Sequence, residues 1–160
     1  MTGPARLGYA INQWKPNFDD FTRREQHVRA LKVIAACGFS GVELRAGTGR
    51  WDPLGRPASI AANYGSAAAF TDLLRQIGVE EVCSWYFDPG EPVGEELSPG
   101  RSVLEGGLVD FPRLMRALKE HEFTGWITVE HDKANIGGDY AESTALSMWY
   151  AKHVLREIYS

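Results

Sequence analysis

The chain has 160 residues, of which 44% are hydrophobic and 24% are charged, and its formal net charge is -4 at pH 7. This balance is typical of one soluble globular domain with an apolar core, so we expect a single domain over residues 1–160. The 17 basic residues are scattered along the sequence, which disfavours nucleic acid as a partner. No apolar run is long enough to span a membrane and no signal-peptide pattern is present, so we expect a cytoplasmic protein without a membrane partner.

The first predicted element is an apolar strand over Arg6–Gln13, which delivers two polar or amphipathic residues at its end. Asn12 could donate hydrogen bonds to a substrate, and Trp14 could form the wall of a pocket. A turn-forming Asn12 and a core Trp14 are the structural alternative.

A helix is predicted from Asp19 or Asp20 to about Ala36, because apolar residues recur there at helical spacing and an aspartate can cap its start. His27 lies among the charged residues of this segment, so we expect a solvated surface histidine. Cys37 follows the helix and is far in sequence from Cys83; both are predicted to be free thiols in apolar settings.

The second predicted strand is Gly41–Arg45, an apolar run that Glu43 interrupts. Burying a carboxylate without a partner is costly, so Glu43 needs either an ion-pair partner or a function. Arg45 is a candidate partner because residues i and i+2 lie on the same face of a strand. Function is the favoured interpretation of Glu43.

The segment Ala46–Ser66 is rich in glycine and proline and also contains aromatic residues. It is too long for an ordinary connection, so we expect a loop that forms a lid or pocket wall. Trp51 and Tyr64 are the aromatic residues that such a loop would present to a ligand.

A second helix is predicted over about Ser66–Ile77, and a third strand over Glu81–Phe87 carries Trp85, which could face a pocket or the core. The acidic, Gly- and Pro-rich stretch between Gly90 and Gly107 is the one candidate junction in the chain. A helix then follows from Asp110 to about Glu120, and the last helix covers about Tyr140–Ile158.

The segment Gly125–Asp132, with the sequence GWITVEHD, has the strongest functional pattern. Its apolar strand Trp126–Val129 is typical of a parallel sheet and ends in Glu130, His131 and Asp132. Sites in parallel α/β folds are built at the carboxyl ends of strands. Alternation makes Glu130 and Asp132 the inward pair; a solvated or capping carboxylate is the alternative for Glu130.

Four features together resemble the xylose-isomerase-like barrels, the sugar phosphate isomerase/epimerase superfamily that includes inosose dehydratases. They are the strand-end Asn12 and the runs FSGVEL from Phe39, GGLVDF from Gly106, and GWITVEHD from Gly125. The resemblance covers two blocks, residues 6–89 and 104–159, which are similar to the first three units and the last unit of such a barrel. The intervening units, which in the family supply a Glu, an Asp and a His to the metal site, have no counterpart.

The resemblance implies half of a (β/α)8 TIM barrel, with four parallel strands and flanking helices. The last strand should neighbour the first, which leaves two open edges. Two copies related by a two-fold axis could close the barrel, so we expect a homodimer, with a heteromeric partner as the alternative.

The function that the resemblance implies is isomerase, epimerase or dehydratase chemistry, with acid–base proton transfer on a polyol, a cyclitol or another small oxygenated carbonyl compound. Its expected catalytic residues are Glu43, Glu130 and His131. Glu130 matches the one remaining metal-ligand position, so a divalent metal such as Mg or Mn is a possible cofactor. A non-catalytic small-molecule-binding or regulatory subunit is the alternative function. The expected substrate-binding residues are Asn12, Trp14, Arg45, Trp51, Trp85 and Asp132.

Overall fold

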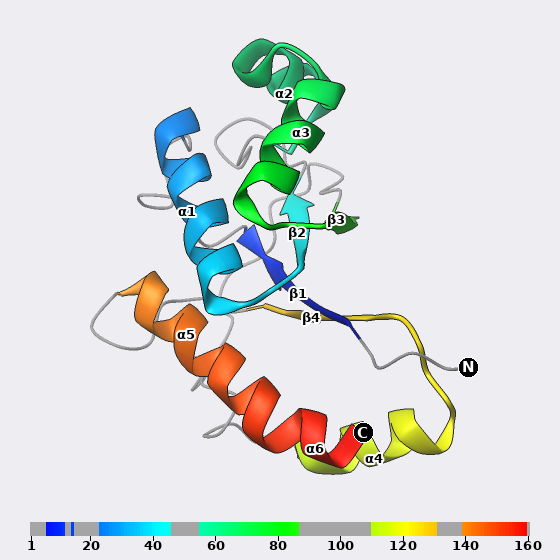
Figure 1. The fold of residues 1–160 in the computed structure, drawn as a ribbon. Helices are drawn as coiled ribbons and strands as arrows, with labels where there is room; N and C mark the ends of the chain where they lie inside the picture. The colour runs from blue at the N-terminus through cyan, green and yellow to red at the C-terminus, as the bar shows by residue number, and fades with distance from the viewer. Residues whose placement is uncertain are drawn as a thin grey trace, which may run out of the picture.

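The computed structural model describes residues 6–11, 14, 23–45, 55–86, 110–130 and 139–159 (Figure 1). Strands and helices alternate along much of the chain, as the sequence predicts. The elements are β1 (Arg6–Ala10), α1 (Arg24–Cys37), β2 (Gly41–Arg45), α2 (Pro57–Tyr64), α3 (Ala67–Ile77), β3 (Glu81–Tyr86), α4 (Phe111–Glu120), β4 (Trp126–Val129), α5 (Tyr140–Tyr150), the π-helical turn η4 (Ala151–Leu155) and α6 (Arg156–Tyr159).

The four strands form one parallel sheet in the order β3-β2-β1-β4. The last strand therefore lies beside the first, as predicted, although a long stretch of sequence separates them. Gly8 of β1 pairs with Gly41 of β2, and Tyr9 pairs with Val129 of β4. The strands β3 and β4 are the two edges of the sheet.

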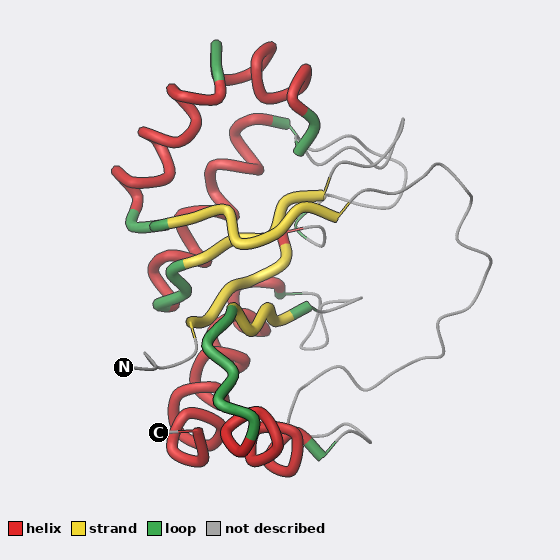
Figure 2. Tube along the Cα trace, turned by 90° about the vertical axis from the view of Figure 1, so that its right-hand side faces the viewer, coloured by secondary structure: helices red, strands yellow, loops and turns green. Residues whose placement is uncertain are grey.

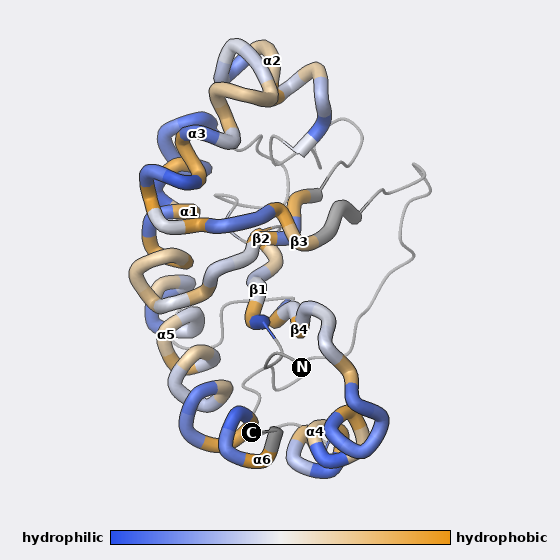
Figure 3. Tube along the Cα trace, turned by 45° about the vertical axis from the view of Figure 1, so that its right-hand side comes forward, coloured by the Kyte–Doolittle hydropathy of each residue, from blue (hydrophilic) through white to orange (hydrophobic). Residues whose placement is uncertain are grey.

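The helices α1, α3 and α5 lie on one side of the strands, and no described helix lies on the other side (Figures 2 and 3). The strands turn alternate side chains toward this helical layer, where Tyr9, Val42 and Leu44 are fully buried. They form the main core together with residues of α1, α3 and α5, namely Leu31, Ile34, Phe70, Leu74 and Met148.

A smaller apolar cluster joins the C-terminal helices to α4, through Met115, Tyr150 and Leu155. Ile127 of β4 packs against this cluster. This contact is expected, because α4 directly precedes β4 in the chain. Within the described ranges, none of the helices combines the length and the hydropathy needed to cross a membrane.

Short polar side chains determine where several helices begin. Ser66 accepts a hydrogen bond from the backbone N–H of Ala69 at 3.0 Å, and Asp110 accepts one from Arg113 at 2.9 Å. Asp139 does the same for the first turn of α5. The helix α1 differs from the prediction, because it begins at Arg24 and not after Asp19 or Asp20.

The predicted continuous loop over residues 46–66 is wrong in its second half, where α2 occupies Pro57–Tyr64. Pro57 stands at the first helical position, where its fixed φ favours a helix and its missing N–H has no cost. Gly65 follows the helix with φ 87°. The alanines between these two residues have high helix propensity, which the loop interpretation overlooked.

The prediction that His27 is a solvated surface residue is also wrong. His27 is fully buried where α1, α2 and α3 meet. Its Nδ1 atom lies 2.6 Å from the hydroxyl oxygen of Tyr64, and its ring stacks on Phe70 with centroids 6.0 Å apart. Tyr64 therefore contributes to the helical layer, and the expectation that it contacts a ligand finds no support in these contacts.

Burial lowers the pKa of His27 from 6.5 to about 4. Between these values the unfolded chain binds more protons than the folded chain, so the free energy of unfolding is highest above pH 6.5 and decreases as the pH falls toward 4. In wild type, acidification should lower the free energy of unfolding by up to about 3 kcal/mol through His27, and we expect His27→Gln to remove this decrease. Urea unfolding at pH 7, 5.5 and 4.5 measures this difference.

The matched control is His121→Gln, because His121 is exposed at the end of α4. If wild type and His27→Gln lose the same stability between pH 7 and 4.5, the buried histidine is not the group that responds to acid.

The sheet is strongly curled, and its concave face is turned away from the helices. The Cys83 sulfur of β3 lies 3.6 Å from the Thr128 hydroxyl of β4, although two strands separate these edges. In a flat sheet, strands three positions apart lie roughly 14 Å from each other. Both side chains meet above Gly8, where an added Cβ would lie 2.6 Å from the Cys83 sulfur.

A second set of contacts crosses the amino-terminal end of the concave face. Arg6 forms an ion pair with Glu81 at 3.0 Å, and its guanidinium lies 4.2 Å from the centre of the Trp126 ring. The Trp126 ring extends from β4 across β1 to Gly41 of β2. Glycine at position 41 leaves room for this contact, because an added Cβ would overlap the Trp126 ring.

We expect Gly41→Ala to destabilise the fold by about 1–3 kcal/mol, because the added methyl overlaps the Trp126 ring and forces it or the strand to move. Urea unfolding monitored by tryptophan fluorescence measures the change. Ser40→Ala, one residue earlier and half-buried, is the control and should change stability by less than about 0.5 kcal/mol. Equal effects of the two substitutions would show that Trp126 does not lie over Gly41.

Candidate functional site

The carboxyl ends of the four strands lie at one edge of the sheet, where a glutamate occupies β2 and another follows β4. Ala10 pairs with Glu43, and Glu43 pairs in turn with Ser84. Tyr9 pairs with Val129, so Glu130 is level with Ala10. The two glutamates therefore stand on either side of β1, with their Cα atoms roughly 9–10 Å apart.

Glu43 belongs to the concave face of the sheet, and strand alternation continued from Val129 would point Glu130 to the same side. Val42 and Leu44 are fully buried against the helices, so the side chain of Glu43 between them points the other way. Val129 is buried in the same helical layer, and Glu130 is the next residue. Glu43 is half-buried and Glu130 is exposed, while Ala10 between them adds only a methyl group.

The pKa of the Cys83 thiol depends in part on the charge of Glu43. Burial raises the pKa of Cys83, and the carboxylates of Glu43 and Glu81 raise it further, against the lowering effect of the Thr128 hydrogen bond. A carboxylate that acts on this thiol must be close to the concave face. Both cysteines are free, as predicted.

An aromatic pair borders the ends of β1 and β4. Trp14 follows β1 and packs against the main core, and its ring lies 5.8 Å from that of Tyr140, the first residue of α5. The indole Nε1 of Trp14 is buried and has no hydrogen-bond partner among the described residues. The core role for Trp14 is thus confirmed, and its role as a pocket wall stays a prediction.

Several predicted site residues are not placed by the structure. Asn12, Trp51, His131 and Asp132 lie outside the described residues. The backbones of Arg45 and Trp85 belong to β2 and β3, where Leu44 pairs with Trp85 and Arg45 with Tyr86, but their side chains are outside the described part of the chain. The junction between Gly90 and Gly107 is outside it as well.

The structure adds residues that the sequence analysis did not select, namely Cys83, Thr128 and Tyr140. A register shift between β2 and β3 at Val42 and Glu43 changes the alternation in β3, so counting alternate residues along that strand does not identify its concave positions. For Tyr140 a usable signal exists, because Asp139 caps α5 and thereby places Tyr140 in its first turn.

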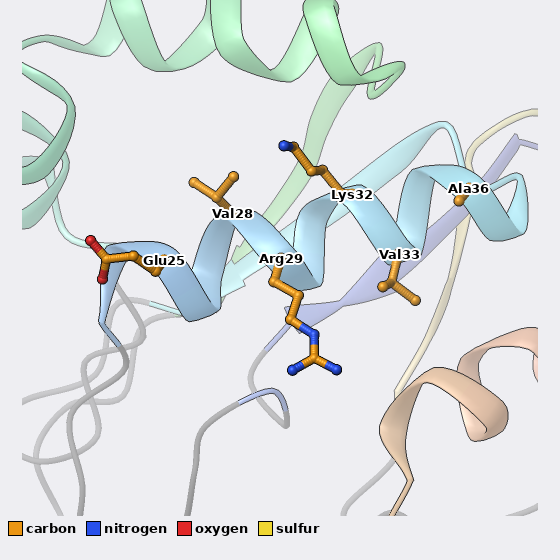
Figure 4. Close-up of a pocket in the computed structure, with 6 residues that line it drawn as sticks. All are labelled: Glu25, Val28, Arg29, Lys32, Val33 and Ala36. Carbon is orange, nitrogen blue, oxygen red and sulfur yellow. The ribbon is translucent and has the colours of Figure 1, made fainter.

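A shallow surface hollow of about 520 Å³ lies elsewhere, along α1. Its lining residues Glu25, Val28, Arg29, Lys32, Val33 and Ala36 all come from this one helix (Figure 4). No strand-end residue contributes to it, so this hollow is not the candidate site.

Among the described residues, no three His, Cys, Asp or Glu side chains are close enough together to hold a metal ion. Glu130 is the one residue there that the resemblance assigns to a metal. The described donor set therefore does not fit the family's metal site.

Comparisons of the chain with protein-family models, with curated proteins and with solved structures gave no match. The resemblance to xylose-isomerase-like barrels therefore stays a prediction, and the assignment of a function depends on the geometry of the strand ends.

If Glu43 lies close to Cys83, then Glu43→Gln should lower the pKa of the thiol and speed its alkylation by iodoacetamide at pH 8, because the neutral amide no longer opposes formation of the thiolate. Mass spectrometry of Cys83-containing peptides measures the rate. Glu130→Gln is the matched control, since Glu130 does not contribute to the pKa shift of Cys83. Unchanged reactivity in Glu43→Gln would contradict the placement of Glu43 on the concave face.

Proposed function

We propose that the chain is half of a parallel (β/α)8 barrel and acts as an acid–base enzyme of the isomerase or lyase kind. The single observation that carries the proposal is the placement of Glu43 and Glu130 on either side of Ala10 at the carboxyl edge of the sheet. This is the edge at which parallel α/β enzymes build their sites.

The substrate class that fits is a small polyol, cyclitol or carbonyl compound. Two carboxyl groups on one concave face can divide the roles of base and acid, one taking a proton while the other gives one. One glutamate removes a proton from a hydroxyl-bearing carbon next to a carbonyl, and the other, in its acid form, protonates the carbonyl oxygen, which gives an enediol.

The enediol then has two outcomes that conserve atoms and charge. Return of the proton to the neighbouring carbon gives the isomer, and return to the opposite face of the original carbon gives the epimer. Loss of a β-hydroxyl as water gives the dehydrated product: the glutamate that took the carbon-bound proton supplies it to the departing oxygen, and the enediol oxygen returns its proton to the other glutamate as the carbonyl reforms. Trp14 and Tyr140 would border the apolar side of the substrate, and His131 and Asp132 would relay protons near Glu130.

The resemblance also implies Mg or Mn at Glu130. Since the described donors do not form a three-ligand group, no step of the proposed chemistry is derived through a metal.

The experiment is exchange of carbon-bound hydrogen for deuterium in D2O, followed by NMR over a panel of keto-sugars, aldoses and the ketone forms of cyclitols and polyols, because the step needs a carbonyl next to the exchanging carbon. We expect exchange with at least one compound class, and a loss of about 10²-fold or more in Glu43→Gln and in Glu130→Gln, because general acid–base groups contribute that much. Glu80→Gln is the matched control, since Glu80 is exposed and directly precedes β3, at the amino-terminal ends of the strands and away from Glu43 and Glu130.

Circular dichroism checks that each variant is folded. Exchange that persists in both glutamine variants would reject the assigned roles. A compound that binds without any exchange would replace the enzyme with a small-molecule-binding or regulatory subunit.

A further inference from the structure

The strands β3 and β4 are the two edges of the curled sheet. In the described part of the chain, β3 pairs only with β2, and β4 pairs only with β1. Open strand edges bind further strands readily, and a closed barrel removes them. The concave face between these edges is the side that no described helix covers (Figure 2).

We propose that a second copy of this chain docks on the concave face and closes an eight-stranded parallel barrel about a two-fold axis. In this arrangement β3 of each copy pairs with β4 of the other, so the same junction occurs twice. The inference rests on the half-barrel arrangement of the proposed function, but not on its chemistry.

The partner is a second copy of this chain, because it must pair with both edge strands, β3 and β4, at the same time. A two-fold axis along the barrel places the β3 edge of one chain beside the β4 edge of the other and keeps all strands parallel. Four strands are half of the number that closes such a barrel, and this chain is already curled, as the contact between Cys83 and Thr128 shows. A partner that covered one edge alone would leave the other open.

Barrel closure also defines the register of the new junctions. A (β/α)8 barrel has a shear of about eight residues, so each of two identical junctions shifts the register by about four residues. Within one chain Ser84, Glu43 and Ala10 are level, and Glu130 is level with Ala10. A shift of four residues from Glu130 places Ser84 beside Trp126 of the second copy.

The same register places Tyr86 beside Thr128 of the second copy. A shift of four residues in the opposite direction would place β3 beside residues beyond the end of β4. Only the shift toward Trp126 therefore pairs β3 with β4 of the second copy. Because the shift is an even number of residues, side chains of the concave face in one copy also lie next to side chains of the concave face in the other.

Closure changes the surroundings of the candidate site. Within one chain, β1 separates Glu43 from Glu130. In the closed barrel, β3 would stand between Glu43 and the Glu130 of the second copy, which the register shifts by four residues along its strand, and both copies would line one mouth. A single chain would supply only half of that rim.

The first measurement is the solution mass by light scattering across a range of protein concentrations. We expect twice the chain mass of 17.8 kDa. The register is tested by Tyr86→Cys with Thr128→Cys, in a background that carries Cys37→Ser and Cys83→Ser. Mild oxidation should then convert most of the protein to a covalent dimer, because paired strands bring the Cα atoms within the range that a disulfide bridges.

The matched control is Val82→Cys with Thr128→Cys in the same background. The register places Val82 about three to four residues away from the Thr128 of the second copy, roughly 10–13 Å along the strand, so no disulfide should form. Because the curl brings β3 and β4 of one chain together near Thr128, only oxidised product at twice the chain mass on a non-reducing gel counts as a bridge between copies.

Three results would overturn the inference. They are a folded monomer at all concentrations, a dimer that does not cross-link through Tyr86→Cys and Thr128→Cys, and equal cross-linking of the control pair. These readouts need no substrate. Loss of the proposed enzyme activity with a correct dimer would therefore reject the chemistry alone, and a monomer with proton-exchange activity would reject the dimer alone.

Discussion

The contact between Cys83 and Thr128 above Gly8 is the interaction on which the rest of the structure depends. It brings together side chains from the two edges of a four-stranded sheet, which is possible only because the sheet is curled. Glycine at position 8 provides the space, since a side chain there would overlap the Cys83 sulfur. The curl separates a helical face, which holds the core, from a concave face, which holds charge.

The concave face is organised in levels along the strands. At the amino-terminal end, Arg6 connects Glu81 to the ring of Trp126. Cys83 and Thr128 meet in the middle, and Glu43 and Glu130 occupy the carboxyl-terminal end on either side of Ala10. Ion pairing and cation–π contact thus stabilise the end opposite the proposed chemistry, while the carboxylates remain at the end where parallel folds bind small molecules.

Short-range sequence patterns specify several elements of this fold. The strands Gly41–Arg45 and Trp126–Val129 have the predicted limits, because apolar β-branched and aromatic runs between turn residues specify strands locally. The helices after Ser66, Asp110 and Asp139 begin where capping side chains stand. The helix α2 was missed because its Pro57 was interpreted as a loop signal, although proline is favoured at the first helical position.

The sequence alone thus determined the main elements, their parallel arrangement and the two strand-end glutamates, since these follow from periodicity and from caps within a few residues. The predicted order, with the last strand beside the first, came from a family resemblance and agrees with the structure. Only the tertiary structure decided that His27 is buried, that Trp126 lies over Gly41, and that the register shift at Glu43 changes which β3 residues face inward. These features depend on contacts between residues far apart in the chain, for which local propensity and alternation carry no information.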